Sequence, residues 1–169
     1  NGWIAKTLRR ATRNVAVANF AFSEQALADA LADAGALNPS LHVRTIGERS
    51  FATRFYSELL DIWGLALLRL PEEAPSHPCT YEDGNKPWPF AGEAGIASMA
   101  SGDKMHHKFA VIDDRTVLFG SHNWSESANR GNDETVIAIH DAGIAREFMG
   151  EFERLAREFG ISERLIDNR

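Results

Sequence analysis

The chain has 169 residues, of which 44% are hydrophobic and 25% are charged, and this composition suits a single domain that buries a core. Its formal net charge of −6 argues against a general nucleic-acid binder. The net charge does not rule out a local basic patch on the surface. The single cysteine, Cys79, excludes an internal disulfide and a multi-cysteine zinc site, and no apolar run reaches membrane-spanning length. The sequence does not fix the cellular location.

The N-terminal part of the chain alternates between helical and strand patterns. Predicted helices cover residues 3–12, 23–35 and 51–64, and predicted strands cover residues 14–22, 41–47 and 65–70. Ser23 is the expected N-cap of the second helix, and Gly64 is expected to end the third. This alternation predicts an α/β fold with a mixed, mainly parallel β-sheet that is flanked by helices.

The pattern breaks over residues 71–104, which hold five of the six prolines and show no clear period. A loop of this length is uncommon in a compact domain and is usually functional or mobile. In one interpretation, Trp88, Phe90 and Met99 of this loop cover a site or contact an apolar ligand. In the other, the loop is a surface excursion that packs on its own aromatic residues. The sequence favours neither interpretation.

Regular patterns return at His106. Residues 108–113 and 116–121 are predicted to form two strands joined by a tight turn at residues 114–115, and residues 134–139 a last strand. Asp141 is the expected N-cap of a long helix that ends at Gly160. One face of this helix carries the apolar residues Ala145, Phe148, Met149, Phe152, Leu155 and Phe159. The chain is therefore predicted to be one domain, residues 1–169, with a long loop at 71–104.

Two histidines and a lysine stand at the start of the strand at 108–113. Because side chains alternate across a strand, His106 and Lys108 should share one face, and His107 should point to the other as a core or interface residue. Adjacent histidines that face opposite ways do not suit a shared metal ion. Asp113 has odd spacing from His106, so it is expected to anchor structure away from the His106 face.

Further polar side chains follow at the neighbouring strand ends. Ser121 and Asn123 share one parity at the end of the second strand, and Glu134 opens the last strand at the same end of the sheet. A neutral imidazole can attack phosphorus, and a carboxylate partner can fix its tautomer. A lysine and an asparagine amide can hold phosphate oxygens as charge develops. This set predicts phosphoryl transfer without a metal or another cofactor.

The stretch "HHKFAVID" fits the pattern H-x-K-x-x-x-x-D, and "GSHN" and "NDE" follow it. In these motifs the chain resembles the phospholipase D superfamily with its HKD motif, and "GSHNWS" and "NDE" look more like its single-motif endonuclease branch than like the classical lipases. The resemblance implies that His106 is the catalytic histidine and that Lys108 and Asn123 bind phosphate. It also implies that Ser121 and Glu134 support the site.

The resemblance predicts a metal-independent phosphodiesterase that acts through a phosphohistidine, with DNA or RNA as the favoured substrate. A phospholipid hydrolase or phosphatidyl transferase is the alternative, and an inactive binding module is a third. The family site uses two HKD motifs and this chain carries one, so the second is expected from a homodimer partner or from a missing N-terminal half. A nucleic-acid substrate would require Lys104, Lys108 and Arg130 to lie near the site.

Overall fold

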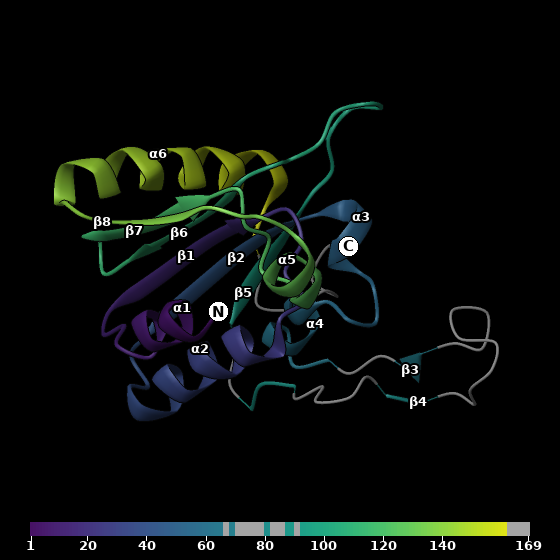
Figure 1. The fold of residues 1–169 in the computed structure, drawn as a ribbon, viewed down its shortest axis with the longest axis horizontal. Coiled ribbons are helices and arrows are strands. Elements are labelled where there is room, and N and C mark those ends of the chain that lie inside the picture. The colour runs from purple at the N-terminus through teal and green to yellow at the C-terminus, as the bar shows by residue number, and fades with distance from the viewer. Residues whose placement is uncertain (66–67, 70–79, 82–86, 90–91, 162–169) are drawn as a thin grey trace.

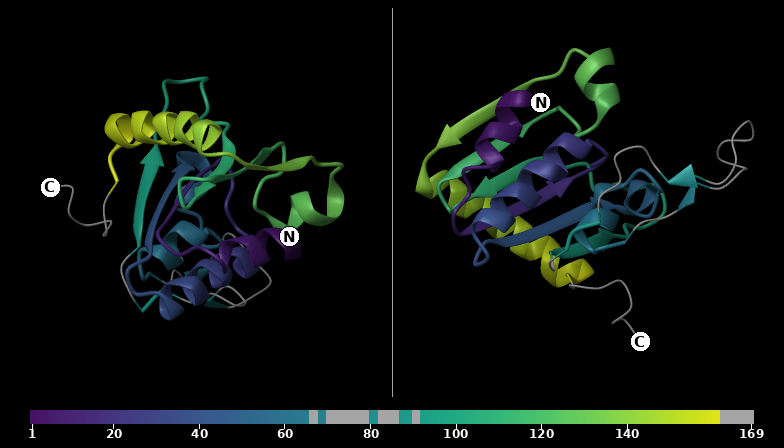
Figure 2. Two further views of the ribbon diagram at one scale, coloured as in Figure 1. Left: turned by 90° about the vertical axis from the view of Figure 1, so that its left-hand side faces the viewer. Right: turned by 90° about the horizontal axis from the view of Figure 1, so that it is seen from below.

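The fold is a six-stranded sheet with helices on both faces (Figures 1 and 2). The computed structural model describes residues 1–65, 68–69, 80–81, 87–89 and 92–161. The sheet has the order β5-β2-β1-β6-β7-β8. Its strands are β1 (Asn14–Asn19), β2 (His42–Glu48), β5 (Glu93–Ala97), β6 (Lys108–Ile112), β7 (Thr116–Gly120) and β8 (Val136–His140).

The expected mixed α/β sheet is confirmed, and the balance of its pairings differs from the prediction. Strand β2 runs parallel to β1 and to β5, whereas the β1–β6, β6–β7 and β7–β8 pairs are antiparallel. The parallel pairs arise because a helical crossover separates β1 from β2. The antiparallel pairs arise where a hairpin or a strand returning from a distant segment completes the sheet.

Helices cover the two faces because alternate strand residues point to opposite sides. On one face, α1 (Gly2–Leu8), α2 (Gln25–Leu37) and α4 (Glu58–Ile62) pack on Val15, Val17, Ala110 and Leu118. On the other, α6 (Ala142–Phe159) packs on Ala18, Phe109, Val111 and Val117 through the apolar face predicted for it. Figure 2 shows this three-layer arrangement from the side.

The ends of several elements differ from the predicted ones. Helix α1 already ends at Leu8, and α2 begins at Gln25, so Glu24 rather than Ser23 occupies its N-cap position. The helix predicted over 51–64 is two short helices, α3 (Arg49–Ala52) and α4. They separate because Ser57 N bonds back to Arg54 O and Glu58 N bonds across to Phe22 O, which takes the chain off the helical path. Gly64 follows α4 with a φ of 73°.

The predicted third strand lies outside the main sheet, and the predicted loop contains a strand of that sheet. Of residues 65–70 the structure describes 65, 68 and 69, and Leu68–Arg69 forms strand β3, which pairs with β4 (Thr80–Tyr81). Strand β5, which lies within the predicted loop, extends the main sheet beside β2. Trp88 is buried in the core, Met99 is exposed, and Phe90 lies outside the described residues.

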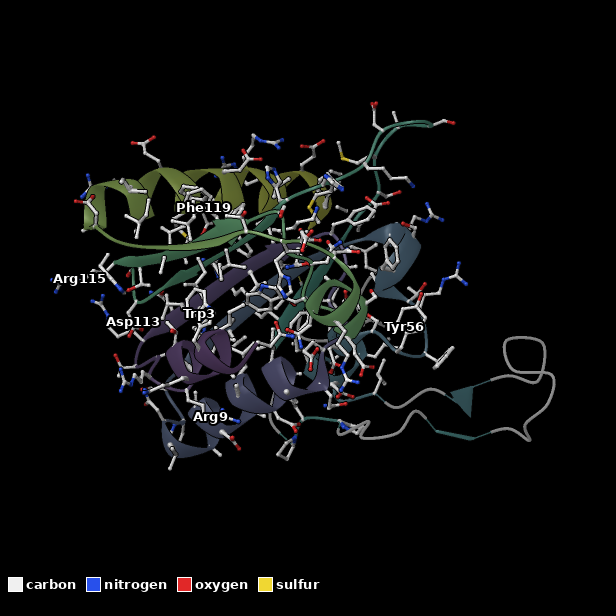
Figure 3. The ribbon with its side chains drawn as sticks, viewed as in Figure 1. Trp3, Arg9, Tyr56, Asp113, Arg115 and Phe119 are labelled. Atoms are coloured by element: carbon white, nitrogen blue, oxygen red, sulfur yellow. The ribbon has the colours of Figure 1, made fainter. Side chains whose placement is uncertain are left out.

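The strand ends set the position of the candidate site. The register pairs Asn19 with Lys108 and Gly47 with Asn19, and it pairs Ala97 with Glu48. Gly120 ends β7 beside the start of β6, and it pairs with Val136 at the start of β8. The strand ends on one side of the sheet, called here the site edge, therefore bring together the segments that carry His106 and Ser121. The turn at Asp113 lies at the other ends of the strands, called here the opposite edge (Figure 3).

Candidate active site

His106 and Lys108 lie together at this edge and share the ring of Phe20. The His106 ring meets it edge-on at 4.6 Å between centroids, and Lys108 Nζ lies 5.1 Å from the same centroid. Lys108 Nζ also donates a hydrogen bond of 3.0 Å to the carbonyl of His106. The lysine is buried, and this burial lowers its pKa, while the negative charge of Glu134 acts in the opposite direction.

His107 points to the other face, as the strand alternation predicts. Its Nε2 lies 2.9 Å from Oε1 of Glu151 on α6, and its ring contacts Phe109. The backbone carbonyl of His107 accepts a hydrogen bond from Phe20 N at 2.8 Å. The residue after His106 is thus fixed to α6 and to the segment that follows β1, which orients the His106 backbone.

Glu134 and Ser121 form a bonded pair on the neighbouring strands. The Ser121 hydroxyl donates to Glu134 Oε2 and accepts from Thr135 N at 3.0 Å. Asn132 Nδ2 donates to the other carboxylate oxygen at 3.0 Å. The Ser121 hydroxyl, and then the Asn132 amide, hold the pKa of Glu134 below its usual value, so this side chain is a carboxylate facing Lys108 and His122.

Asn123 follows Ser121 into a hollow of about 330 Å³. Its Oδ1 is buried and has no hydrogen-bond partner among the described residues. The hollow is lined by Ala21, Ser23, Phe51, Tyr56, Asn123, Ser125 and Ser127. Phe51 also contacts Phe20, with 4.9 Å between ring centroids, so the hollow adjoins the ring that carries His106 and Lys108. An unpaired buried amide oxygen beside a hollow suits a group that binds a ligand.

Asp113 lies at the far end of β6, where its carboxylate accepts hydrogen bonds from the backbone of residues 12–14. Burial raises the pKa of this carboxyl, but the backbone amides of Arg13, Thr12 and Asn14 and the Thr12 hydroxyl outweigh it and leave the pKa lowered. Asp113 and Asp114 both have positive φ, 53° and 56°, and Arg115 N bonds to Ile112 O. The turn is therefore centred on residues 113–114, one residue earlier than predicted.

Two buried polar residues of the site edge were missed from the sequence. Glu48, at the end of β2, is 3% exposed, and its Oε2 accepts a hydrogen bond of 3.0 Å from Met105 N, immediately before His106. Asn19, at the end of β1, accepts from Ala21 N at 3.1 Å and from Trp124 N at 3.5 Å. Each is the polar last residue of its strand, and this position at a strand end is the sequence feature that could have identified it.

Of the three cations expected near the site, Lys108 is part of it and Lys104 forms an ion pair of 3.5 Å with Glu48. Arg130 lies on α5 (Glu126–Gly131), where it pairs with Glu126 at 3.2 Å. Among the described residues, no group of three or more His, Cys, Asp or Glu side chains is placed to hold a metal ion. None of the helices in the described ranges combines the length and apolar character needed to cross a bilayer.

The chain matches known proteins over most of its length. The sequence profile of the family described as "Cardiolipin synthase, PLD-like domain" matches residues 4–156. Mitochondrial cardiolipin hydrolase of Mus musculus is 44% identical over 55 residues, and that of Xenopus laevis is 44% identical over 69 residues. These matches cover 32% and 41% of this chain, and only 25% and 32% of the two relatives' own lengths.

Solved structures share the fold at low identity. Nuc from Salmonella typhimurium, a phospholipase D family member, has a TM-score of 0.65 at 14% identity, covering 94% of this chain and 87% of that one. NucT from Helicobacter pylori has a TM-score of 0.66 at 18% identity with the same coverages. The family profile spans the whole of the described sheet and the HKD stretch, and the chain belongs to the phospholipase D superfamily.

Proposed function

We propose that this chain is a phosphodiesterase that cleaves nucleic-acid phosphodiester bonds through a phosphohistidine on His106. The observation that carries the proposal is the placement of His106 and Lys108 on one ring, at the sheet edge where Ser121 holds Glu134. This placement supplies a nucleophile, a positive charge and a carboxylate on neighbouring strand ends, in a superfamily that the sequence already indicates.

The reaction follows from these groups. A neutral His106 attacks phosphorus and forms the N–P bond while the P–O bond to the leaving alcohol breaks. Lys108 and Asn123 hold the non-bridging oxygens, whose negative charge grows in the transition state. Ser121 keeps the Glu134 carboxylate in place beside Lys108. Water then attacks the phosphohistidine and gives a proton to the group that protonated the leaving alcohol, and the N–P bond breaks to release the phosphate monoester and the free imidazole.

The leaving alcohol must take up a proton in the first step. The attacking imidazole has to be unprotonated and the acid protonated, so two imidazoles are required. The second is His106 of another copy, or a second HKD motif in a longer protein. His122 of the same chain is a poor substitute, because burial lowers its pKa and its Nε2 is bonded to Asn1 Oδ1 at 2.8 Å.

A phospholipid substrate is the second candidate, and the relatives named mitochondrial cardiolipin hydrolase favour it. The test is turnover by the purified chain of single-stranded DNA, RNA, cardiolipin vesicles and the chromogenic diester bis(p-nitrophenyl) phosphate, each with and without a chelator. We expect nucleic acid to be cleaved best, with activity that survives the chelator. Faster turnover of cardiolipin would replace the nucleic-acid proposal with the lipid one.

His106→Asn should lower turnover by several orders of magnitude, because it removes the nucleophile. His107→Asn is the matched control, since it changes the adjacent histidine on the opposite face and should leave most of the activity. Equal rates for wild type and His106→Asn would refute the assignment of the nucleophile.

A further inference from the structure

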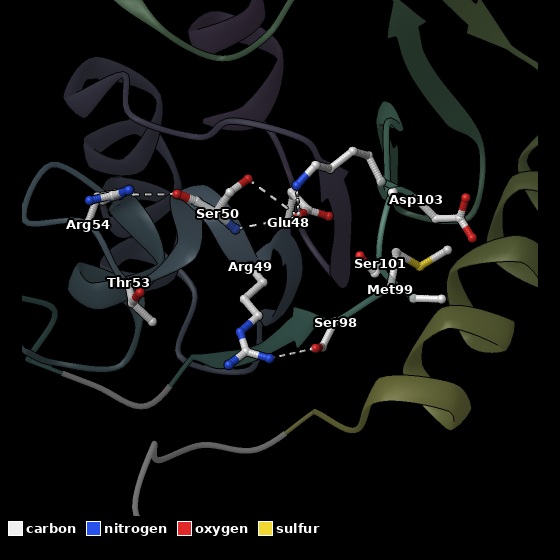
Figure 4. A pocket seen from close by; sticks show the side chains of 12 residues that line it. Glu48, Arg49, Ser50, Thr53, Arg54, Ser98, Met99, Ser101 and Asp103 are labelled. Atoms are coloured by element: carbon white, nitrogen blue, oxygen red, sulfur yellow. Dashed lines mark hydrogen bonds and ion pairs between the residues drawn. The ribbon is translucent and has the colours of Figure 1, made fainter.

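A second hollow, of about 460 Å³, lies at the same edge of the sheet (Figure 4). Its walls are the end of β2, helix α3 with the two residues after it, and the segment of residues 98–104 that leads into His106. Helix α3 also carries Phe51, whose ring contacts Phe20, and Phe20 contacts His106. The hollow is therefore a neighbour of the candidate active site along both the chain and the packed rings.

Three cations line this hollow, namely Arg49, Arg54 and Lys104. Of its two carboxylates, Asp103 is exposed, whereas Glu48 is buried and already engaged by Lys104, by Met105 N and by the Ser50 hydroxyl at 3.4 Å. The Glu48 charge is thus largely used within the protein. The lining holds three cations against two carboxylates, a formal charge of +1, in a chain whose net charge is −6.

Arg49 is the cation best placed to meet a ligand. Its Nη1 donates a 3.0 Å hydrogen bond to the neutral hydroxyl of Ser98, and no carboxylate among the described residues lies within ion-pair distance of it. Figure 4 shows its side chain reaching along the wall to Ser98. A guanidinium has five donors and binds phosphate oxygens in a two-pronged geometry, so Arg49 keeps donors for an anion after the Ser98 bond is made.

The rest of the lining suits a phosphate rather than an acyl chain. Hydroxyl groups come from Ser50, Thr53 and Ser101, and Met99 is the one large apolar side chain among the lining residues. Hydroxyl and guanidinium groups are the usual contacts to nucleic-acid phosphate oxygens. A nucleic-acid strand differs from a single diester in presenting further phosphates beside the one being cleaved.

We propose that this hollow binds a neighbouring, uncleaved phosphate of the nucleic-acid strand whose scissile phosphate lies at His106 and Lys108. The inference rests on the proposed function and adds a second contact point to it, with Arg49 as the principal ligand and Arg54 and Lys104 as supporting charges. The site selects for polymeric substrates, because a minimal diester has no second phosphate to place there.

The test compares kcat/KM for a short single-stranded oligonucleotide with kcat/KM for bis(p-nitrophenyl) phosphate. Arg49→Gln should lower the ratio of the two about tenfold, the effect expected when one charge-assisted hydrogen bond is lost. Arg49→Lys should restore part of the ratio, because it keeps the charge but not the two-pronged geometry. Arg115→Gln, which removes an exposed arginine at the opposite edge, is the matched control and should leave the ratio unchanged.

A second readout is oligonucleotide binding to the His106→Asn variant, which does not turn the substrate over. The slope of log Kd against log salt should fall by about 0.7 when Arg49→Gln is added, as expected for one lost phosphate contact on a single strand. Ser98→Ala removes the hydrogen bond of Arg49 but not its charge, so it should preserve both the ratio and the slope.

The inference is overturned if Arg49→Gln and Arg115→Gln have the same ratio, or if Ser98→Ala reproduces the loss seen with Arg49→Gln. Either result would show that Arg49 acts only through the local structure or not at all. Failure of the proposed function has a different signature, since wild-type protein would then hydrolyse the chromogenic diester or cardiolipin but not the oligonucleotide.

Discussion

The buried side-chain amide of Asn19 connects two segments of the candidate site. It ends β1 at 1% exposure, directly opposite Lys108 in the β1–β6 register. Its Oδ1 accepts from the backbone of Ala21 and of Trp124, the residue after Asn123. Because the carbonyl oxygen is shared between two segments, Asn19 fixes the position of Asn123 relative to Lys108. A residue outside both motifs thus sets the spacing between Lys108 of the HKD stretch and Asn123 of "GSHN".

Asp113 gives a prediction about stability alone. Asp113→Ala removes the acceptor for three backbone amides and one hydroxyl and should lower the free energy of unfolding by about 2 kcal/mol, measured by urea denaturation. Asp114→Ala is the matched control, since Asp114 also has positive φ but makes an exposed pair with Arg13 and one bond to Asn14. Its cost should be smaller. Turnover per folded molecule should be unchanged in both variants.

The pH dependence of that effect has a definite sign. The folded-state pKa of Asp113 is lowered, so its contribution is complete above the unfolded-state value of about 3.9 and is lost as the pH falls through the folded-state pKa. The difference between wild type and Asp113→Ala should therefore be constant near neutral pH and shrink below about pH 4. A difference that grew on acidification would show that the carboxylate is not stabilised by these bonds.

The placement of the site side chains was predictable where it depended on local alternation. His106 and Lys108 contact one ring, and His107 contacts α6, as the strand parity predicts. Glu48 was not predictable, because its partner Met105 is 57 positions away in the sequence. Spacing patterns within one segment cannot predict a contact between two distant segments that come together only when the sheet forms.

At the level of elements, Gly120 ends β7 at a point where its backbone lies close to the segment that leads into β8. A Cβ atom at this position would lie 1.9 Å from the carbonyl oxygen of Thr135, which is a backbone clash. Gly120→Ala should therefore cost about 2 kcal/mol of stability and also lower kcat, because the two strands that hold Ser121 and Glu134 must move apart. Thermal or urea unfolding and steady-state turnover measure the two effects.

Gly150→Ala is the control for that substitution. Gly150 lies inside α6 with nothing within 4 Å of its Cβ position, so alanine there should stabilise the protein by about 0.5–1 kcal/mol. Unchanged stability and turnover in Gly120→Ala would show that the ends of β7 and β8 can separate without harm to the site.

Tertiary contacts explain why some elements differ from those predicted from the sequence. Strand β5 reads "EAGIA", which is weak in strand-forming residues, but Gly95 belongs there because a Cβ would lie 2.3 Å from the carbonyl oxygen of Gly160 at the end of α6. The helix predicted over 51–64 breaks because Phe51 turns to pack on Phe20 and Glu58 bonds to the Phe22 carbonyl. The strongly periodic α6 and the hairpin strands were predicted correctly, apart from one-residue shifts.

At the scale of the whole molecule, the proposed mechanism requires two HKD motifs and therefore a dimer of this chain or a longer protein. Mixing wild type with an excess of His106→Asn chains, under conditions in which subunits exchange, should reduce activity more than dilution does. Mixed dimers lack one of the two imidazoles, so activity should follow the square of the wild-type fraction. Turnover at a series of mixing ratios, together with sedimentation analysis of the active species, measures this.

A strictly monomeric chain with full activity would contradict that prediction and place the acid within one copy. Within the described ranges, His42 and His140 lie at the edge of the sheet opposite His106, and His107 faces α6. His122→Asn would then be the next variant to assay, in spite of the burial that lowers its pKa.

The HKD stretch is written as one motif, yet β6 divides it into two parts that lie about 17 Å apart. His106 and Lys108 belong to the chemistry at one edge, and Asp113 belongs to the turn at the other. Under the proposed function the two ends serve different purposes, chemistry at one and stability at the other. A stabilising substitution elsewhere in the domain can then offset the loss of Asp113, whereas added stability does not replace the proposed nucleophile His106. On this proposal, a relative that keeps only the first half of the motif can still be an enzyme, and one that keeps only the second half has retained a scaffold.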